Sequence, residues 1–126
     1  MPAMPIVDTL LRPLYDAMLA AADPRVVLPA HLPQPPTQAG ARTVVVGVGK
    51  AAAAMAQAVE AHWPGPLSGV VVVPEGATLP LRHIEQVVGS HPVPDARSVA
   101  AGQRLLQTVQ GLGPHDLVIA LISGGG

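Results

Sequence analysis

The sharpest chemical signal in the sequence is a glycine-rich turn that ends in a lysine. Gly47 and Gly49 precede Lys50, and Ala52 completes a G-x-G-x-x-A spacing directly after an apolar run. In such a turn the glycines let a phosphate approach the backbone, and the following helix N-terminus supplies positive potential. Any tight strand-to-helix turn also favours glycine, so both interpretations stay open. The turn is not a Walker A loop, because Ala51 stands where that loop needs Ser or Thr for magnesium.

Lys50 strengthens the phosphate interpretation. It is the only lysine in the chain, and the sequence predicts it in the first turn of a helix, where a positive charge opposes the helix dipole. An anionic ligand, either a phosphoryl or a carboxylate group, would offset this unfavourable interaction. The alternative is a solvated surface lysine.

A second anion-binding loop is predicted at the end of the chain. Ser123, Gly124, Gly125 and Gly126 follow an apolar run, and side chains do not obstruct the backbone N–H groups of consecutive glycines. The first and fourth strands of a doubly wound sheet flank the point where ligands bind. We therefore expect residues 123–126 to face residues 47–50 across one crevice, as two phosphate-binding turns around one ligand.

Two other residues are candidates for the same site. His91 lies in the segment Ser-His-Pro-Val-Pro-Asp, where it can donate a hydrogen bond to an anionic substrate or act as a general base. The alternative is a structural turn in which Asp95 caps a helix. Glu75 follows the second strand, where dinucleotide-binding folds hold the ribose, but ordinary turn chemistry also explains it. No histidine pair has zinc-ligand spacing with a third ligand, so no metal site is predicted.

The elements that position these residues follow the pattern of a parallel sheet. Continuous apolar runs predict strands over residues 43–48, 69–73, 84–88 and 117–122. Helices are predicted over residues 50–62 and from Asp95 to the turn at 111–114, the latter with an inner stripe of Val99, Gly102, Leu105, Leu106 and Val109. Right-handed crossovers make this an α/β fold with a Rossmann-like, doubly wound, mainly parallel sheet in strand order 3-2-1-4. We expect the sheet to be incomplete at the C-terminus.

Residues 1–42 are predicted to precede this core. Apolar residues at helical spacing indicate an amphipathic helix over residues 6–22, with a kink at Pro13 or a separate short piece before it. Residues 23–42 are rich in proline and lack a sustained period, which predicts a linker or wrapping loop. Residues 43–126 form the Rossmann-like core.

Composition narrows the class of function. The 126 residues suffice for one domain, and 49% apolar with 12% charged residues predicts a packed core. A net charge of −1 without a basic stripe argues against nucleic acid as a partner. The absence of cysteine excludes disulfides and thiolate nucleophiles within the chain and fits a cytoplasmic protein. No apolar window is long enough to span a membrane, so no membrane partner is expected.

Three motifs in this order and spacing resemble the amino-terminal region of class II glycerate 2-kinases, the MOFRL-type family whose members are often labelled hydroxypyruvate reductases. The motifs are the segment 45–55 with its glycines and lysine, the His-Pro-Val-Pro-Asp of residues 91–95, and the Leu-Ile-Ser-Gly-Gly-Gly of residues 121–126. Glu75-Gly76-Ala77 departs from the family, which more often has Tyr-Gly-His there. A ligand role for this loop is therefore left open.

The resemblance implies a transferase that uses ATP and Mg²⁺ to phosphorylate the 2-hydroxyl of D-glycerate, giving 2-phosphoglycerate. It implies that Lys50 acts at the reacting phosphate and that residues 123–126 begin a phosphate-binding loop. Family members have a second domain and the active site in the cleft between the two, so we expect this chain to be a fragment without kinase activity of its own. Two alternatives are an NAD(P)-dependent hydroxypyruvate reductase, suggested by Glu75 and the glycine spacing, and a stand-alone, non-catalytic nucleotide-binding module. Nucleotide preference and assembly into a homo-oligomer are left open.

Overall fold

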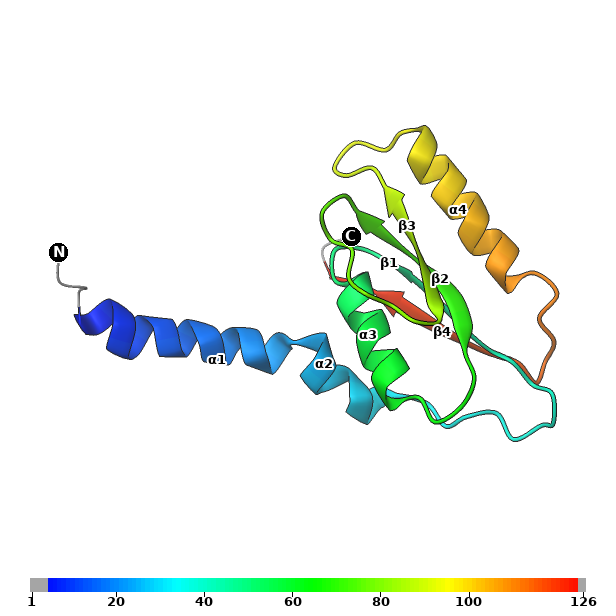
Figure 1. The fold of residues 1–126 in the computed structure, drawn as a ribbon, viewed down its shortest axis with the longest axis horizontal. Helices are drawn as coiled ribbons and strands as arrows, with labels where there is room; N and C mark the ends of the chain where they lie inside the picture. The colour runs from blue at the N-terminus through cyan, green and yellow to red at the C-terminus, as the bar shows by residue number, and fades with distance from the viewer. Residues whose placement is uncertain (1–4, 125–126) are drawn as a thin grey trace.

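The computed structural model describes residues 5–124, and its centre is a sheet of four parallel strands (Figure 1). The strands are β1 (Thr43–Val48), β2 (Ser68–Pro74), β3 (Ile84–Gly89) and β4 (Leu117–Ile122), and they lie in the order β3-β2-β1-β4. The structure thus confirms the predicted α/β class, the parallel pairing and the strand order. Because all pairs are parallel, the carboxyl ends of the four strands lie at one edge of the sheet.

One face of the sheet packs against α3 (Ala52–His62) and forms the hydrophobic core. Alternate strand residues point to this face, and the alanines of α3 allow the helix to approach them closely. The fully buried side chains here include Val45 and Val71 of the strands and Val59 of the helix. Trp63, which follows α3, closes one end of the same cluster. Burial of each valine contributes about 1.5–3 kcal/mol.

The opposite face is covered by α4 (Ala96–Val109), and only in part. The predicted inner stripe of this helix is wrong for Val99, Gly102 and Leu106, all of which are exposed, whereas Ala101 is buried. The reason is that α4 packs mainly on β3 and β2, so the stripe is turned toward the part of the sheet that the helix does not cover. Together with that part of the sheet it lines an apolar hollow of about 290 Å³, formed by Val46, Gly47, Val48, Leu105, Leu106, Val109, Ala120 and Ile122.

The connection between β2 and β3 has no helix, and the loop 75–83 packs against α3 instead. The Gln57 side-chain amide donates to the carbonyl oxygen of Pro80 at 3.1 Å. The Glu60 carboxylate accepts the backbone N–H groups of Arg82, His83 and Ile84 at 2.8–3.0 Å. Glu60 therefore fixes the point at which β3 begins.

We expect Glu60→Gln to lower the free energy of unfolding by about 1–2 kcal/mol, because an amide accepts these hydrogen bonds less strongly than a carboxylate. Partial burial by itself raises the pKa of Glu60, but the three backbone donors outweigh it and hold the pKa below its ordinary value of 4.5. A lowered folded-state pKa stabilises the protein above the unfolded-state pKa, and this stability disappears as pH falls through the folded-state value. Urea unfolding at pH 7 and pH 3 measures both effects.

Glu85→Gln is the matched control for this prediction. Glu85 pairs with Arg104 at 2.6 Å, but both side chains are about half exposed, so its loss is expected to change stability by less than about 1 kcal/mol. Equal destabilisation by the two substitutions, or an effect of Glu60→Gln that persists undiminished at pH 3, would contradict the role given to Glu60.

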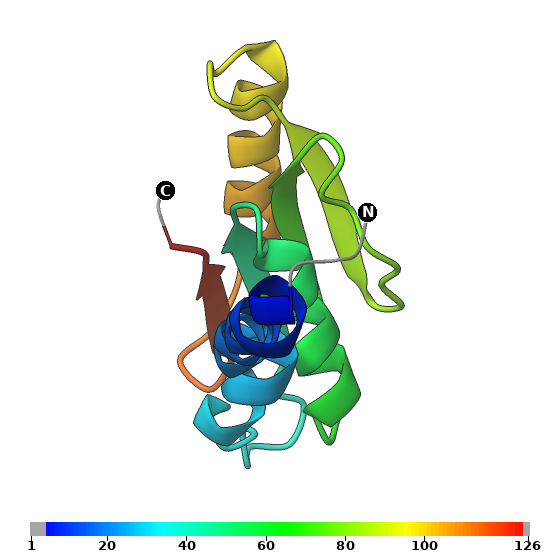
Figure 2. The ribbon, with the colours of Figure 1, turned by 90° about the vertical axis from the view of Figure 1, so that its left-hand side faces the viewer.

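The N-terminal segment forms an arm that projects from the sheet domain. The π-helix η1 (Val7–Leu11) runs into α1 (Arg12–Ala22), with Pro13 in the first turn of α1. The predicted helix over residues 6–22 is confirmed. The backbone stays helical through Leu11 and Arg12, so the expected separate piece before Pro13 is not found, and the helix has a π-helical segment there instead. Figure 1 shows the arm reaching away from the domain, and Figure 2 views it end-on. Its large apolar side chains are exposed: Ile6, Val7, Leu10, Leu11, Leu14, Tyr15, Met18 and Leu19.

Part of the predicted linker is helical. The short helix α2 (Pro24–Val27) is followed by the 3-10 helix η2 (Leu28–His31). The Asp23 carboxylate caps α2 by accepting the backbone N–H of Arg25 at 2.9 Å, and the Arg25 side chain, its main partner, lowers the pKa of Asp23. Pro24 suits the first turn of a helix because it needs no N–H partner there. Leu28 then packs against the core beneath α3, which anchors the arm.

Across residues 5–124, every helix is too short or too polar to cross a membrane.

Candidate functional site

The candidate site is a cleft of about 380 Å³ at the carboxyl edge of the sheet. It is built by the residues that follow β1, β2 and β3 and by the first turn of α4. Its lining is Lys50, Pro74, Glu75, Gly76, Ala77, Gly89, Ser90, His91 and Arg97. The structure thus brings together Lys50, Glu75 and His91, which the sequence predicted at this edge from three separate strands.

Lys50 stands in the turn between β1 and α3. The structure places it just before the N-cap residue Ala51, so its predicted position in the first helical turn is corrected by two residues. No side chain caps this helix, because Ala51 has none that can accept a hydrogen bond. Lys50 is exposed and directly precedes the N-cap of this uncapped helix. The lysine and the helix N-terminus both favour an anion.

The two positions of the turn require glycine for different physical reasons. Gly47 is buried inside β1, where a Cβ atom would lie 2.9 Å from Val71 Cγ1 and 3.0 Å from the carbonyl oxygen of Leu121. Close packing within the sheet is enough to require glycine there. Gly49 has φ +121°, and a Cβ atom on it would lie 1.9 Å from Ser123 Oγ. Only glycine lets the chain turn at this point while β4 ends beside it. Phosphate contact by either glycine stays a prediction.

The two glycine loops lie side by side, as the strand order predicted, but they touch each other directly. Lys50 lines the cleft and Ser123 does not, so the predicted crevice between the two loops is not seen in the described residues. The backbone N–H of Ser123 donates to the carbonyl oxygen of Val48 at 3.2 Å, and Ser123 Oγ lies against Gly49. Gly124 follows as an exposed turn residue. The predicted contributions of Gly125 and Gly126 fall outside the residues that the structure describes. Ser123 is therefore placed next to the Lys50 turn, and its phosphate-binding role stays a prediction.

Arg97 is the residue of the cleft that the sequence did not single out. Its Nε donates to Asp95 Oδ2 at 3.2 Å, and its guanidinium lies 4.0 Å from the Glu75 carboxylate. The lining of the cleft thus holds two full cations, Lys50 and Arg97, and one carboxylate, Glu75; Arg97 is also paired with Asp95. The sequence signal that could have found Arg97 was its position two residues after a helix cap at the ligand edge.

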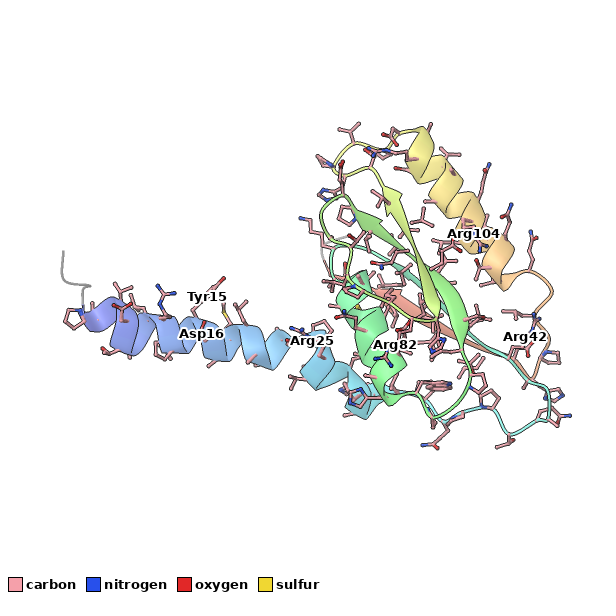
Figure 3. All side chains as sticks on the ribbon, in the orientation of Figure 1. Tyr15, Asp16, Arg25, Arg42, Arg82 and Arg104 are labelled. Atoms are coloured by element: carbon pink, nitrogen blue, oxygen red, sulfur yellow. The ribbon has the colours of Figure 1, made fainter. Side chains whose placement is uncertain are left out.

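Two other arginines, labelled Arg42 and Arg104 in Figure 3, lie on the far side of the domain from the projecting arm.

Asp95 holds the start of α4 in place. Its carboxylate accepts the backbone N–H of Arg97 at 2.8 Å, and Ser98 completes a reciprocal capping box. Burial alone would raise the pKa of Asp95, but the backbone and side chain of Arg97 outweigh it and lower this pKa. The predicted cap is confirmed. Asp95 therefore keeps its negative charge at neutral pH and fixes the direction in which Arg97 points.

The residues of the cleft do not provide the ligands of a magnesium ion. Magnesium prefers several carboxylate or water oxygens in octahedral geometry. Glu75 is the only carboxylate that lines the cleft, and it lies beside Arg97. Among residues 5–124 no group of three His, Cys, Asp or Glu side chains is placed to hold a metal ion. These residues do not make a protein-bound magnesium site.

Residues 10–126 match the family model described as "Domain of unknown function (DUF4147)". A protein of Agrobacterium vitis named "Putative hydroxypyruvate reductase" is 52% identical over 117 residues, which cover 92% of this chain and 26% of that protein. The "D-glycerate 2-kinase" of Thermotoga maritima is 39% identical over 87 residues, covering 68% of this chain and 21% of that protein.

A solved structure carries the same fold. The crystal structure of a glycerate kinase from Thermotoga maritima superposes with a TM-score of 0.72 and 31% identity, over 87% of this chain and 26% of that one. The chain spans about a quarter of the length of the relatives that it matches.

Proposed function

The chain belongs to the DUF4147 family, and from this membership and the cationic cleft we propose that it is the amino-terminal part of an ATP-dependent glycerate 2-kinase. The names of two Thermotoga relatives, D-glycerate 2-kinase and glycerate kinase, support this proposal. In the proposed reaction, the 2-hydroxyl oxygen of D-glycerate forms a bond to the γ-phosphorus of ATP. The bond to the leaving ADP breaks, and 2-phosphoglycerate is formed.

The observation that carries the proposal is the placement of Lys50, Arg97 and His91 in one cleft, beside an uncapped helix N-terminus. For phosphoryl transfer a protein mainly has to position the two substrates and neutralise negative charge, and no covalent intermediate with the protein is needed. In our proposal Lys50 neutralises charge on the transferred phosphoryl group. The N–H groups of Gly49 and Ser123 donate to Val72 and Val48 within the sheet, so the nucleotide phosphates are assigned to the backbone that follows these two residues in each loop. His91 binds the substrate.

Magnesium enters this proposal with the nucleotide. Because the described residues of the cleft do not form a magnesium site, we propose that the ion is held by the ATP phosphates and water. When bound, it would neutralise phosphate charge. The protein side of the reaction is therefore assigned to Lys50, to the backbone N–H groups and to residues beyond this segment. As proposed, the full-length enzyme acts on a small acid in the cytoplasm.

A hydroxypyruvate reductase is the second candidate, because the Agrobacterium relative carries that name and Glu75 follows the second strand. The two candidates differ in their co-substrate, so one pair of assays separates them. We expect the full-length protein to form ADP and 2-phosphoglycerate from ATP and D-glycerate, and to leave the absorbance of NADH unchanged with hydroxypyruvate. The 126-residue chain alone is expected to be inactive in both assays. Oxidation of NADH without formation of ADP would overturn the kinase proposal.

A further inference from the structure

A second hollow of about 370 Å³ lies beside the cationic cleft, on the other side of the Lys50 turn. Its walls come from the end of α1, from α2 and η2, from the first turn of α3 and from the end of β4 with the residues that follow it. Ala51 lines this hollow, while the preceding residue, Lys50, lines the cleft. The two sites therefore meet at the turn that leads into α3, and a single ligand that crosses this turn can reach both.

The chemistry of the two sites is opposite. The cleft presents Lys50 and Arg97, whereas the walls of the hollow are mainly aliphatic: Val27 from α2, Leu28 from η2, Met55 from α3 and Ile122 from β4, with His31 of η2 as a polar neighbour. Val27 and Ile122 are 40% and 71% exposed, so they present apolar surface at the ligand edge of the sheet. Aliphatic side chains and a methionine sulfur suit the face of a flat aromatic ring, and they do not bind an anion.

From this placement we infer that the hollow binds the nucleobase of the nucleoside triphosphate. The phosphates would then cross the Gly49–Ala51 turn, past the uncapped N-terminus of α3, toward Lys50. This inference rests on the proposed function, because it takes a nucleoside triphosphate as the phosphoryl donor. It adds a location for the base that family membership does not supply. Ser123, which also lines the hollow, places its hydroxyl against Gly49 of the same turn.

The test compares ATP with inorganic tripolyphosphate, which has the phosphates but no base. We expect Val27→Asn in the full-length protein to weaken ATP binding about tenfold and to leave tripolyphosphate binding unchanged, as measured by calorimetry. Val26→Asn is the matched control, because Val26 is the neighbouring residue of α2, is 67% exposed and does not line the hollow. It should change neither affinity. Both substitutions leave the buried core intact, so a folded protein is expected in each case.

Three outcomes would overturn the inference. Equal affinities of the unaltered protein for ATP and tripolyphosphate would show that the base contributes nothing, although the kinase proposal would survive. An unchanged ATP affinity in Val27→Asn, with a lowered thermal stability, would assign the hollow to another segment of the longer protein. Failure to bind either ligand, together with failure to form ADP, would remove the kinase proposal as well. The first two outcomes are thus distinguishable from the third.

Discussion

Replacement of Lys50 by Met is expected to lower the kcat of the full-length enzyme about 100- to 1000-fold, the effect typical of removing one group that stabilises developing charge in a transition state. Lys50 lines the cleft beside the uncapped N-terminus of α3, and Arg97 is the other full cation among the residues that line it. Methionine keeps the length of the side chain and removes the charge. Formation of ADP from ATP and D-glycerate is the measurement.

The control for this substitution is Arg82→Met. Arg82 is exposed, lies outside the cleft, and contributes only its backbone N–H to Glu60. Its replacement removes one positive charge from the same protein without touching the ligand edge, so kcat is expected to stay within about twofold of the unaltered enzyme, as for a surface substitution. An equal loss of activity in both variants, or unchanged activity in Lys50→Met, would remove Lys50 from the proposed mechanism.

The second large effect is expected on stability. Gly69 lies in β2 directly opposite Val45, and a Cβ atom on it would lie 1.9 Å from the Val45 carbonyl oxygen. With φ +155°, an L side chain here would point into the backbone of the neighbouring strand, and neither strand can move without losing sheet hydrogen bonds. We expect Gly69→Ala to lower the free energy of unfolding by about 3 kcal/mol or more. Urea denaturation of the chain measures it.

Gly102→Ala is the matched control for Gly69→Ala. Gly102 lies on the exposed side of α4, and a Cβ atom there would meet nothing within 4 Å. Alanine favours a helix over glycine by about 1 kcal/mol, so this substitution is expected to stabilise the protein. The two variants should therefore shift the urea midpoint in opposite directions. A midpoint for Gly69→Ala equal to that of the unaltered chain would contradict the close approach of β1 and β2.

Much of the fold could be predicted because its signals are local. The limits of β4 were predicted to the residue, since a continuous apolar run ends at a serine and glycines. The strand order follows from the handedness of crossovers, and it places the end of β1 beside Ser123. Lys50, Glu75 and His91 could be predicted to converge for the same reason: each follows a strand, and parallel strands end at one edge.

What could not be predicted depends on contacts between elements. The stripe containing Val99 and Leu106 has the right period for a buried helix face, but the lateral position of α4 on the sheet decides which side is covered. Arg97 enters the cleft because Asp95 holds its guanidinium, a detail that residue spacing does not encode. Residues 24–31 were predicted as a linker because their prolines interrupt the helical pattern of the sequence. Proline is nevertheless compatible with the first turn of a helix, and both α2 and η2 have it there.

The strand order also determines when this domain can fold during synthesis. The centre of the sheet, β1, pairs on one side with β4, and the Arg42–Asp116 hydrogen bond beside this pair joins residues 74 positions apart. One edge of β1 therefore stays unpaired until β4, at residues 117–122, has left the ribosome. Long-range parallel pairing is intrinsically slow and leaves an apolar edge open to other chains meanwhile. Nascent chains that stop before residue 117 are thus expected to need chaperones, and release of β4 from the ribosome should mark the onset of stable pairing in this four-stranded sheet.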